Sequence, residues 1–365
     1  MKPIFFHFKK LDWVIISAVV GLALLGLTSL YSSSLHSGDF GNFHKQIFFF
    51  TVGILLILIV SFFDWRIFRE SSAFVLGFYC IALILLIGVY FFAPSIRGVK
   101  TWYKIGTLTI DPIEIVKLSL LVLFAKYFSS RHILIYQARH ILLSGLYVLV
   151  PAILIFFQPN LGPCLIIIAL WIGILIITGI KMRHFLALIL IFALIFAGGW
   201  AFLLKDYQKE RIMSFFIPYD PLGISWSQNQ AKTAVGAGGL LGAGIGKGSQ
   251  TQYGFLSEPQ TDFIFAAISE EMGMVGAGAV LCLYLILLWR ITRIALDSYD
   301  NFSRLFCCGL TILLGVQVFI HIGVNIGFLP IIGLPLPLVS YGGSSFLATC
   351  VAIGIVQGMH VNPNV

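Results

Sequence analysis

Two ionisable residues lie one helical turn apart in an otherwise apolar stretch of the chain, Ile110-Asp-Pro-Ile-Glu-Ile-Val-Lys117. Asp111 is expected to cap a helix, Pro112 to be its first residue and Glu114 to complete a capping box. This local explanation does not account for Lys117, which lies at i+3 from Glu114 on the same helix face. Because an ionisable residue at that depth is costly unless it is paired or lines a cavity, we interpret Glu114 and Lys117 as a functional pair.

A second group of carboxylates lies around the start of a later apolar stretch. Asp262 directly precedes this stretch, so its side chain either caps the helix or faces a site at the membrane surface. Glu270 and Glu271 lie about 12 Å deeper along the same helix. Since successive residues turn by about 100°, the two glutamates point in different directions and cannot both serve one site with Asp262. We expect one of them to pair with another helix.

A polar face recurs in the next apolar stretch. Gln317, His321 and Asn325 are four residues apart and therefore share one side of a helix. A metal site would need a second histidine or a carboxylate at ligand spacing, so we predict hydrogen bonds between helices and assign no metal ligands. The 325–345 segment that follows contains three prolines and four glycines. We predict a structured re-entrant segment, because irregular backbone at membrane depth must be buried or line a cavity.

The elements that must position these residues are membrane spans. The chain has 365 residues, of which 59% are hydrophobic and only 10% are charged, whereas a soluble domain carries about 25% charged residues. This composition excludes a soluble enzyme, a disordered protein and a secreted disulfide scaffold. A span needs roughly 20 apolar residues, so we predict an all-α polytopic membrane protein with about ten transmembrane helices. The candidate spans are 11–31, 45–63, 73–93, 110–128, 141–157, 161–180, 184–204, 263–289, 304–326 and 341–360.

Basic residues predict the orientation of these spans. An even number of spans places both termini on one side of the membrane. The N-terminus and the connections on that side hold twelve lysines and arginines, whereas the short connections on the other side hold four. Because short basic loops resist translocation, we predict that both termini are cytoplasmic. We attribute the net charge of +8 to these loops and to anionic lipid, and we expect no nucleic-acid partner.

The longest connection, about 205–262, lies between the seventh and eighth spans and is predicted to be extracytoplasmic. Its phenylalanine, tyrosine, tryptophan and leucine residues predict an ordered cap. The Gly-rich part, 236–249, is not a phosphate-binding loop, because Lys247 is followed by Gly248 and not by serine or threonine. Tight turns and close backbone approach are the expected use of these glycines.

In this topology most of the unusual polar features fall on the outer side. They are the stretch from Arg97 to Lys104, the helix start at Asp111, Gln158-Pro-Asn-Leu-Gly162, the long connection with Asp262, and the 325–345 segment. We therefore predict a single extracytoplasmic site that both membrane and aqueous ligands can reach.

Longer motifs carry a family resemblance. The strongest are Glu258-Pro-Gln-Thr-Asp-Phe-Ile-Phe-Ala-Ala-Ile-Ser-Glu-Glu-Met-Gly273 and Gly333-Leu-Pro-Leu-Pro-Leu-Val-Ser-Tyr-Gly-Gly-Ser-Ser345. The others are Arg97-Gly with Trp102, the Pro-x-Glu-x-x-Lys of 112–117, Gln158-Pro-Asn-Leu-Gly, and Arg211 through Asp220-Pro-x-Gly223. Together they resemble the SEDS family (shape, elongation, division and sporulation proteins), and most closely its rod-shape members. The resemblance covers nearly the whole chain, which we treat as a single transmembrane domain, 1–365.

Three positions depart from the family pattern. The family usually has glutamine where Asp111 stands, aspartate where Asn160 stands and histidine where Gln260 stands. Asn160 leaves its turn without an ionic side chain, and Gln260 removes a titrating neighbour of Asp262.

The resemblance implies a peptidoglycan glycosyltransferase that polymerises lipid II on the outer face of the bacterial cytoplasmic membrane for cell elongation. In that chemistry Asp262 would be the general base for a sugar hydroxyl. Lys117, Arg97 and Arg211 would stabilise the leaving pyrophosphate, with or without a divalent cation such as Mg or Mn. The residues expected to bind substrate are Arg97, Trp102, Glu114, Lys117, Gln158, Arg211, Glu258 and Ser340.

The implied partners are lipid II, a class B penicillin-binding transpeptidase, and the elongation-complex proteins MreC and MreD. We expect the single transmembrane helix of the transpeptidase to dock on the eighth and ninth spans. Two other functions stay open from the sequence: a lipid II flippase, and a non-catalytic scaffold that activates a penicillin-binding protein. A flippase needs polar access from both faces of the membrane, and a scaffold tolerates substitution of Asp262.

Overall fold

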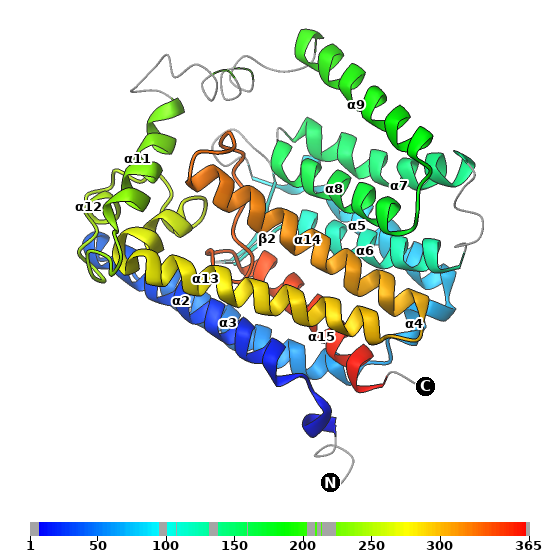
Figure 1. Ribbon diagram of the computed structural model, residues 1–365, viewed down its shortest axis with the longest axis horizontal. Coiled ribbons are helices and arrows are strands. Elements are labelled where there is room, and N and C mark those ends of the chain that lie inside the picture. Colours follow the sequence, from blue (N-terminus) through cyan, green and yellow to red (C-terminus); the bar gives the residue numbers. More distant parts are fainter. Residues whose placement is uncertain are drawn as a thin grey trace.

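The protein is a bundle of long helices, seen here in a computed structural model that describes residues 7–94, 101–106, 108–130, 138–158, 160–202, 209, 213 and 224–362 (Figure 1). Its ten helices of 17 or more described residues are α2 (Trp13–Ser37), α3 (Gly41–Ser61), α5 (Ser72–Phe92), α6 (Pro112–Ser129), α7 (Ala138–Phe157), α8 (Leu161–Ile177), α9 (Met182–Phe202), α13 (Ile264–Asp297), α14 (Asn301–Asn325) and α15 (Gly343–Val361). Each predicted span overlaps one of them.

Eight of these helices are long and apolar enough to cross a membrane. The other two are α8, which is apolar but has 17 residues, and α6, which carries three charged residues among its 18. The prediction of an all-α polytopic membrane protein is confirmed, apart from one short hairpin described below.

Helix α6 lies inside the bundle, and 13 of its 18 residues are buried. It packs against α5 and α14, and α14 in turn packs against α8 and α13. Two further pairs, α3 with α15 and α2 with α13, complete the side that holds the first helices. Helix α9 lies at the periphery, and none of the described residues in its apolar stretch is buried (Figure 1). The charged residues of α6 therefore face protein and not lipid.

The start of the first span, α2, lies beside the end of the last span, α15, at the end of the bundle away from α11 and α12 (Figure 1). The Asp12 N–H donates to Gln357 Oε1, and Gln357 Nε2 donates to the Asp12 carbonyl, both at 2.9 Å. The Asp12 carboxylate caps α2 and forms an ion pair with Arg290 of α13. Both termini thus lie on one side of the bundle, as an even number of spans requires.

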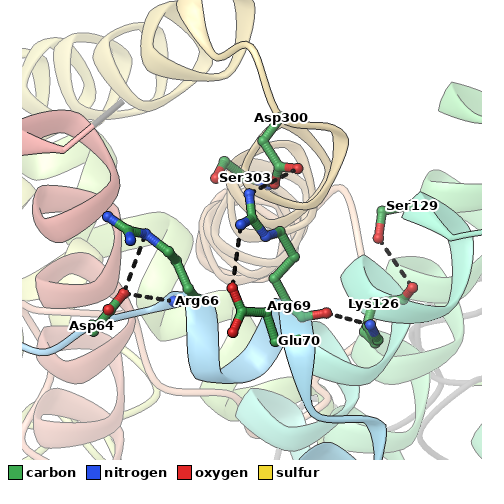
Figure 2. A network of polar contacts seen from close by, with 8 residues as sticks. All are labelled: Asp64, Arg66, Arg69, Glu70, Lys126, Ser129, Asp300 and Ser303. Atoms are coloured by element: carbon green, nitrogen blue, oxygen red, sulfur yellow. Dashed lines mark hydrogen bonds and ion pairs between the residues drawn. The ribbon is translucent and has the colours of Figure 1, made fainter. Parts of the chain in front are cut away.

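The connections at this end carry further ion pairs (Figure 2). Arg69 of the short helix α4 (Arg66–Glu70) lies between Glu70 and Asp300, with N···O distances of 3.5 and 3.7 Å. Lys126 of α6 donates to the Arg69 carbonyl. These contacts join α4 to the last turn of α6 and the first turn of α14.

The opposite end holds structure that the sequence did not predict. Strands β1 (Tyr103–Ile105) and β2 (Leu108–Ile110) form an antiparallel hairpin. Strands of three residues are too short to give a recognisable alternation of apolar and polar residues. The Tyr103 hydroxyl donates to Leu85 O of α5 at 2.7 Å, and burial raises the pKa of this hydroxyl. The hairpin is therefore fixed to α5 at this end of the bundle.

The described part of the long connection contains α11 (Ile224–Ala237) and α12 (Ser249–Gln252). Between them the Gly-rich turns pack against α13 so closely that a Cβ at Gly238 would lie 1.8 Å from Ser269 O. Glu270 accepts two N–H hydrogen bonds from α12, and Glu271 accepts one from the Ser32 hydroxyl of α2 at 2.5 Å. The prediction that one of the two glutamates pairs with another helix is confirmed.

Candidate functional site

A cavity of about 570 Å³ opens at the end of the bundle that holds the hairpin. Its walls come from seven parts of the chain: the hairpin with the residues just before it, the start of α6, the start of α8, the turn before α13, one residue of α14, the segment between α14 and α15, and the start of α15. The polar and charged residues among those lining it are Thr101, Trp102, Thr109, Asp111, Glu114, Lys117, Asn160, Glu258, Thr261, Asp262, Gln317, Tyr341, Ser344 and Ser345. A volume of this size is typical of a small-molecule site.

The hairpin side of the cavity is held by a chain of hydrogen bonds at the start of α6. The Asp111 carboxylate accepts from the Ile113 N–H at 2.9 Å, and Pro112 is the first helical residue, so the predicted cap is confirmed. The Asp111 N–H donates to the Ser344 hydroxyl, which donates to Thr109 O, both at 3.0 Å. One serine thus joins β2, α6 and α15 around the mouth of the cavity.

Glu114 and Lys117 form an ion pair with 2.7 Å between Lys117 Nζ and Glu114 Oε2. Their side chains are 11% and 5% exposed, and both line the cavity. The predicted pairing is confirmed, and Glu114 is not a capping-box partner. A buried pair of this kind lets a positive charge face a cavity without the full cost of an isolated ion.

Asp262 lines the same cavity. The N-cap position of α13 is occupied by Phe263, with no side-chain cap, so Asp262 lies one residue before the cap position. Its neighbour across the cavity wall is Gly333 of the 326–342 segment, where a Cβ would lie 3.5 Å from Asp262 Oδ2. Gly333 also has φ +72°, a conformation that favours glycine. The segment therefore passes close to the carboxylate without a side chain in between.

The structure brings together five of the residues predicted for the site and separates two others. Trp102, Glu114, Lys117, Glu258 and Asp262 all line the cavity.

Gln158 and Ser340 are not among the lining residues. The Gln158 amide donates to Leu86 O, and the Ser340 hydroxyl donates to Thr261 O. Both side chains are buried and bind backbone groups, which their residue types alone do not reveal. Arg97 and Arg211 lie outside the residues that the structure describes.

The polar face of α14 has partners that differ from those predicted. Gln317 Nε2 donates to Pro335 O at 3.3 Å, and His321 Nδ1 lies 2.7 Å from Leu334 O. Within the part of the chain that the structure describes, Asn325 is the residue of this face that bonds to the backbone of another helix, α13. The prediction of bonds between helices is therefore wrong for Gln317 and His321, because the carbonyls of an irregular segment need donors that its own backbone does not supply. The predicted re-entrant segment is present as the non-helical residues 326–342.

Several hydroxyl groups of the cavity were not predicted from the sequence. Thr109, Thr261, Tyr341 and Ser344 all line it. Single hydroxyl residues in turns are too common to be recognised as site residues, although Tyr341 and Ser344 fall within a motif that carried the resemblance. Among the described residues no three histidine, cysteine or carboxylate side chains gather to hold a metal ion.

These features define a class: a multi-pass membrane protein with a cavity at one end of its helix bundle, lined by a buried ion pair and a separate carboxylate. A family model for a cell cycle protein, that of FtsW, RodA and SpoVE, matches residues 10–364. The chain belongs to this family, which is the SEDS family.

Individual relatives match over nearly the whole chain. The peptidoglycan glycosyltransferase MrdB of Escherichia coli K12 is 33% identical over 93% of this chain and 91% of its own length. Stage V sporulation protein E of Bacillus subtilis is 33% identical over 94% and 95%. Both relatives are therefore similar to this chain over more than nine-tenths of its length.

Solved structures agree with the fold. A chain from a study described as "Structural coordination of polymerization and crosslinking by a peptidoglycan synthase complex" superposes with a TM-score of 0.82 at 29% identity, covering 96% of this chain and 97% of that one. The Thermus thermophilus rod shape determining protein RodA superposes with a TM-score of 0.72 at 28% identity, covering 97% and 98%.

Proposed function

We propose that this protein is a peptidoglycan glycosyltransferase that polymerises lipid II for cell shape. The observation that carries the proposal is that the Asp262 carboxylate and the buried Glu114–Lys117 pair line the same cavity. The names of relatives over more than nine-tenths of the chain support the same activity.

The chemistry assigns separate roles to Asp262 and to the Glu114–Lys117 pair. A hydroxyl of one lipid-linked disaccharide attacks the anomeric carbon of another, and Asp262 accepts the hydroxyl proton. The new glycosidic bond forms as the bond from the anomeric carbon to the pyrophosphate oxygen breaks, with inversion. Lys117 supplies positive charge to the departing pyrophosphate, which needs no proton to leave. Glu114 holds Lys117 in place, 2.7 Å away.

A divalent cation fits this site only together with substrate. The carboxylates of the cavity do not form a cluster of three, and Glu114 is already paired with Lys117. Mg²⁺ is usually held by one or two carboxylates together with substrate phosphates. We therefore place any cation at the pyrophosphate, where it would neutralise negative charge.

The test is Asp262→Asn, which preserves shape but removes the base. We expect the rate of glycan formation from labelled lipid II to fall by about 10²–10⁴-fold, measured on gels that resolve glycan chains. Asp300→Asn is the matched control, since Asp300 caps α14 at the other end of the bundle and asparagine caps about as well as aspartate. An Asp262→Asn protein that polymerises normally would contradict the role of Asp262. Wild-type protein that moves lipid II across liposomes without making polymer would identify a flippase.

In the proposed orientation the cavity opens on the outer side of the cytoplasmic membrane and both termini lie in the cytoplasm. The basic connections of the sequence support it. A reporter fused after Val365 is expected to be cytoplasmic and one inserted near Ser249 external; the opposite result at either position would overturn the orientation.

The proposed partners are a class B penicillin-binding protein and, in the elongation complex, MreC and MreD. The chain is similar to one from a peptidoglycan synthase complex of polymerisation and crosslinking. Of the small residues Gly276, Ala277 and Gly278 of α13, the first is buried, whereas the other two are partly exposed and would permit the close approach of a partner helix. Cysteine crosslinks are expected between the partner's transmembrane helix and α13 or α14, and crosslinks confined to α2 and α3 would refute this docking.

A further inference from the structure

Three successive carbonyl oxygens, those of residues 260–262, are each bound by a group from the last part of the chain. The Tyr341 N–H donates to the first at 2.9 Å, and the Ser340 hydroxyl donates to the second at 2.7 Å. The Asn325 side-chain amide donates to the third, the carbonyl of Asp262, at 3.0 Å. The backbone that carries the carboxylate is therefore fixed at every residue of the turn.

Asn325 does more than the other two groups. It is fully buried, and its Oδ1 accepts from the Ala266 N–H in the first turn of α13 at 3.0 Å. Its Nδ2 donates both to Asp262 O and, at 2.8 Å, to His321 O of its own helix. One side chain thus fixes Asp262 and the helix that follows it to the same point on α14.

The placement of a general base depends on this backbone. The Asp262 carboxylate is separated from its own backbone by only one methylene group, so rotation of the turn moves it directly. Gly333 limits movement on the side of the 326–342 segment. A displacement of about 1 Å at a reacting group can slow an enzyme about 10²-fold. Asn325 is not among the residues that line the cavity, so it acts on substrate only through Asp262.

We propose that Asn325 is a positioning residue for the general base, and that its bond to the Asp262 carbonyl sets where the carboxylate lies in the cavity. Ser340 assists by binding the carbonyl of Thr261. This inference rests on the proposed function, because it assigns a role within the same reaction. It adds a residue from a different helix to the site and explains why a buried asparagine stands at the end of α14.

The experiment compares two substitutions with a control. Asn325→Asp keeps the size and the acceptor for Ala266 but removes both N–H donors, and Asn325→Ala removes the whole amide. Tyr284→Phe is the control, because the buried Tyr284 hydroxyl donates to Pro337 O and so binds the same segment without touching the 260–262 turn. All three are measured as purified complexes with the transpeptidase partner, for initial rates on labelled lipid II and for thermal unfolding.

We expect both Asn325 variants to lower kcat by about 10–10²-fold with KM for lipid II within twofold of wild type, because the binding walls stay intact. Tyr284→Phe should keep kcat within twofold. Adding Asn325→Ala to Asp262→Asn should cause no further loss, since a positioning residue has no effect once the base is absent.

Other outcomes separate the two proposals. Equal losses for Asn325→Ala and Tyr284→Phe that follow the fraction of folded protein would reduce Asn325 to a structural residue, as would a double variant whose losses multiply. Either result leaves the polymerase assignment intact so long as wild type makes glycan and Asp262→Asn does not. A wild-type complex that makes no glycan would instead overturn the proposed function.

Discussion

The two ends of the bundle use charged side chains in opposite ways. At the cavity end, Asp262 and the Glu114–Lys117 ion pair line a cavity, and the elements that carry them are held by hydrogen bonds to backbone groups. At the other end, charges neutralise one another: Arg290 binds Asp12, and Arg69 binds Asp300 (Figure 2). Charged side chains line a cavity at one end, whereas at the other end they form ion pairs that join helices of the bundle.

This difference separates function from stability along one axis of the molecule. At the cavity end a substitution should lower the rate per folded molecule, whether or not it also costs stability. At the other end it should change the free energy of unfolding and leave the rate per folded molecule unaltered. Three substitutions test the contrast.

The largest effect is expected for Lys117→Met at the cavity end. The substitution removes the cation that faces the pyrophosphate and leaves the nearly buried Glu114 unpaired. We expect glycan formation to fall by more than about 10²-fold and the protein to lose about 3–5 kcal/mol of stability. Polymerisation assays and chemical unfolding in detergent measure the two losses separately.

A double substitution sharpens this first prediction. Glu114→Gln combined with Lys117→Met removes both charges, so much of the lost stability should return while glycan formation stays low. If activity returned together with stability, the pair would be structural and the cavity wall would have another cation.

Arg290→Met should have an intermediate effect, at the other end. The Asp12 side chain is 1% exposed and would lose its ionic partner, although it keeps the N–H groups of Val14 and Ile15. We expect a loss of about 2 kcal/mol in the free energy of unfolding, with kcat per folded molecule within twofold of wild type. A fall in kcat with unchanged stability would contradict the prediction that charges at this end serve stability alone.

Arg69→Gln should have the smallest effect. The Arg69 side chain is 36% exposed, and its ion pairs with Glu70 and Asp300 span 3.5 and 3.7 Å. Water and salt screen such pairs, so we expect at most about 1 kcal/mol of lost stability, shrinking further at high salt. Thermal unfolding at two salt concentrations measures this, and glycan formation serves as the unchanged control.

The long helices of this fold could be predicted because each leaves a run of roughly 20 apolar residues in the sequence. The Glu114–Lys117 pair could be predicted for a local reason, since its two residues lie one helical turn apart. The hairpin around Tyr103 could not, because its strands have three residues each. Local sequence patterns therefore predict single long helices and contacts within one helix, but not elements as short as this hairpin.

The hydrogen bonds that hold the 260–262 turn could not be predicted in this way. Asn325 and Ser340 bind carbonyl oxygens, and a backbone carbonyl carries no signature in a sequence. The four-residue spacing of Gln317, His321 and Asn325 identified a polar face correctly but gave no partner for it. For the same reason Ser340 was expected to bind substrate, whereas its hydroxyl binds Thr261 O.

The order in which the chain is made has a consequence for this architecture. The cavity needs the hairpin, the start of α6 and residues 330–345, and the bonds between Asp12 and Gln357 join the first span to the last. A nascent chain that has inserted its first eight spans therefore carries Asp262 without the partners that hold it. The carboxylate reaches its final position only after α14 and the segment beyond it have entered the membrane. We therefore expect no glycan formation by the nascent chain until nearly all of its spans are inserted.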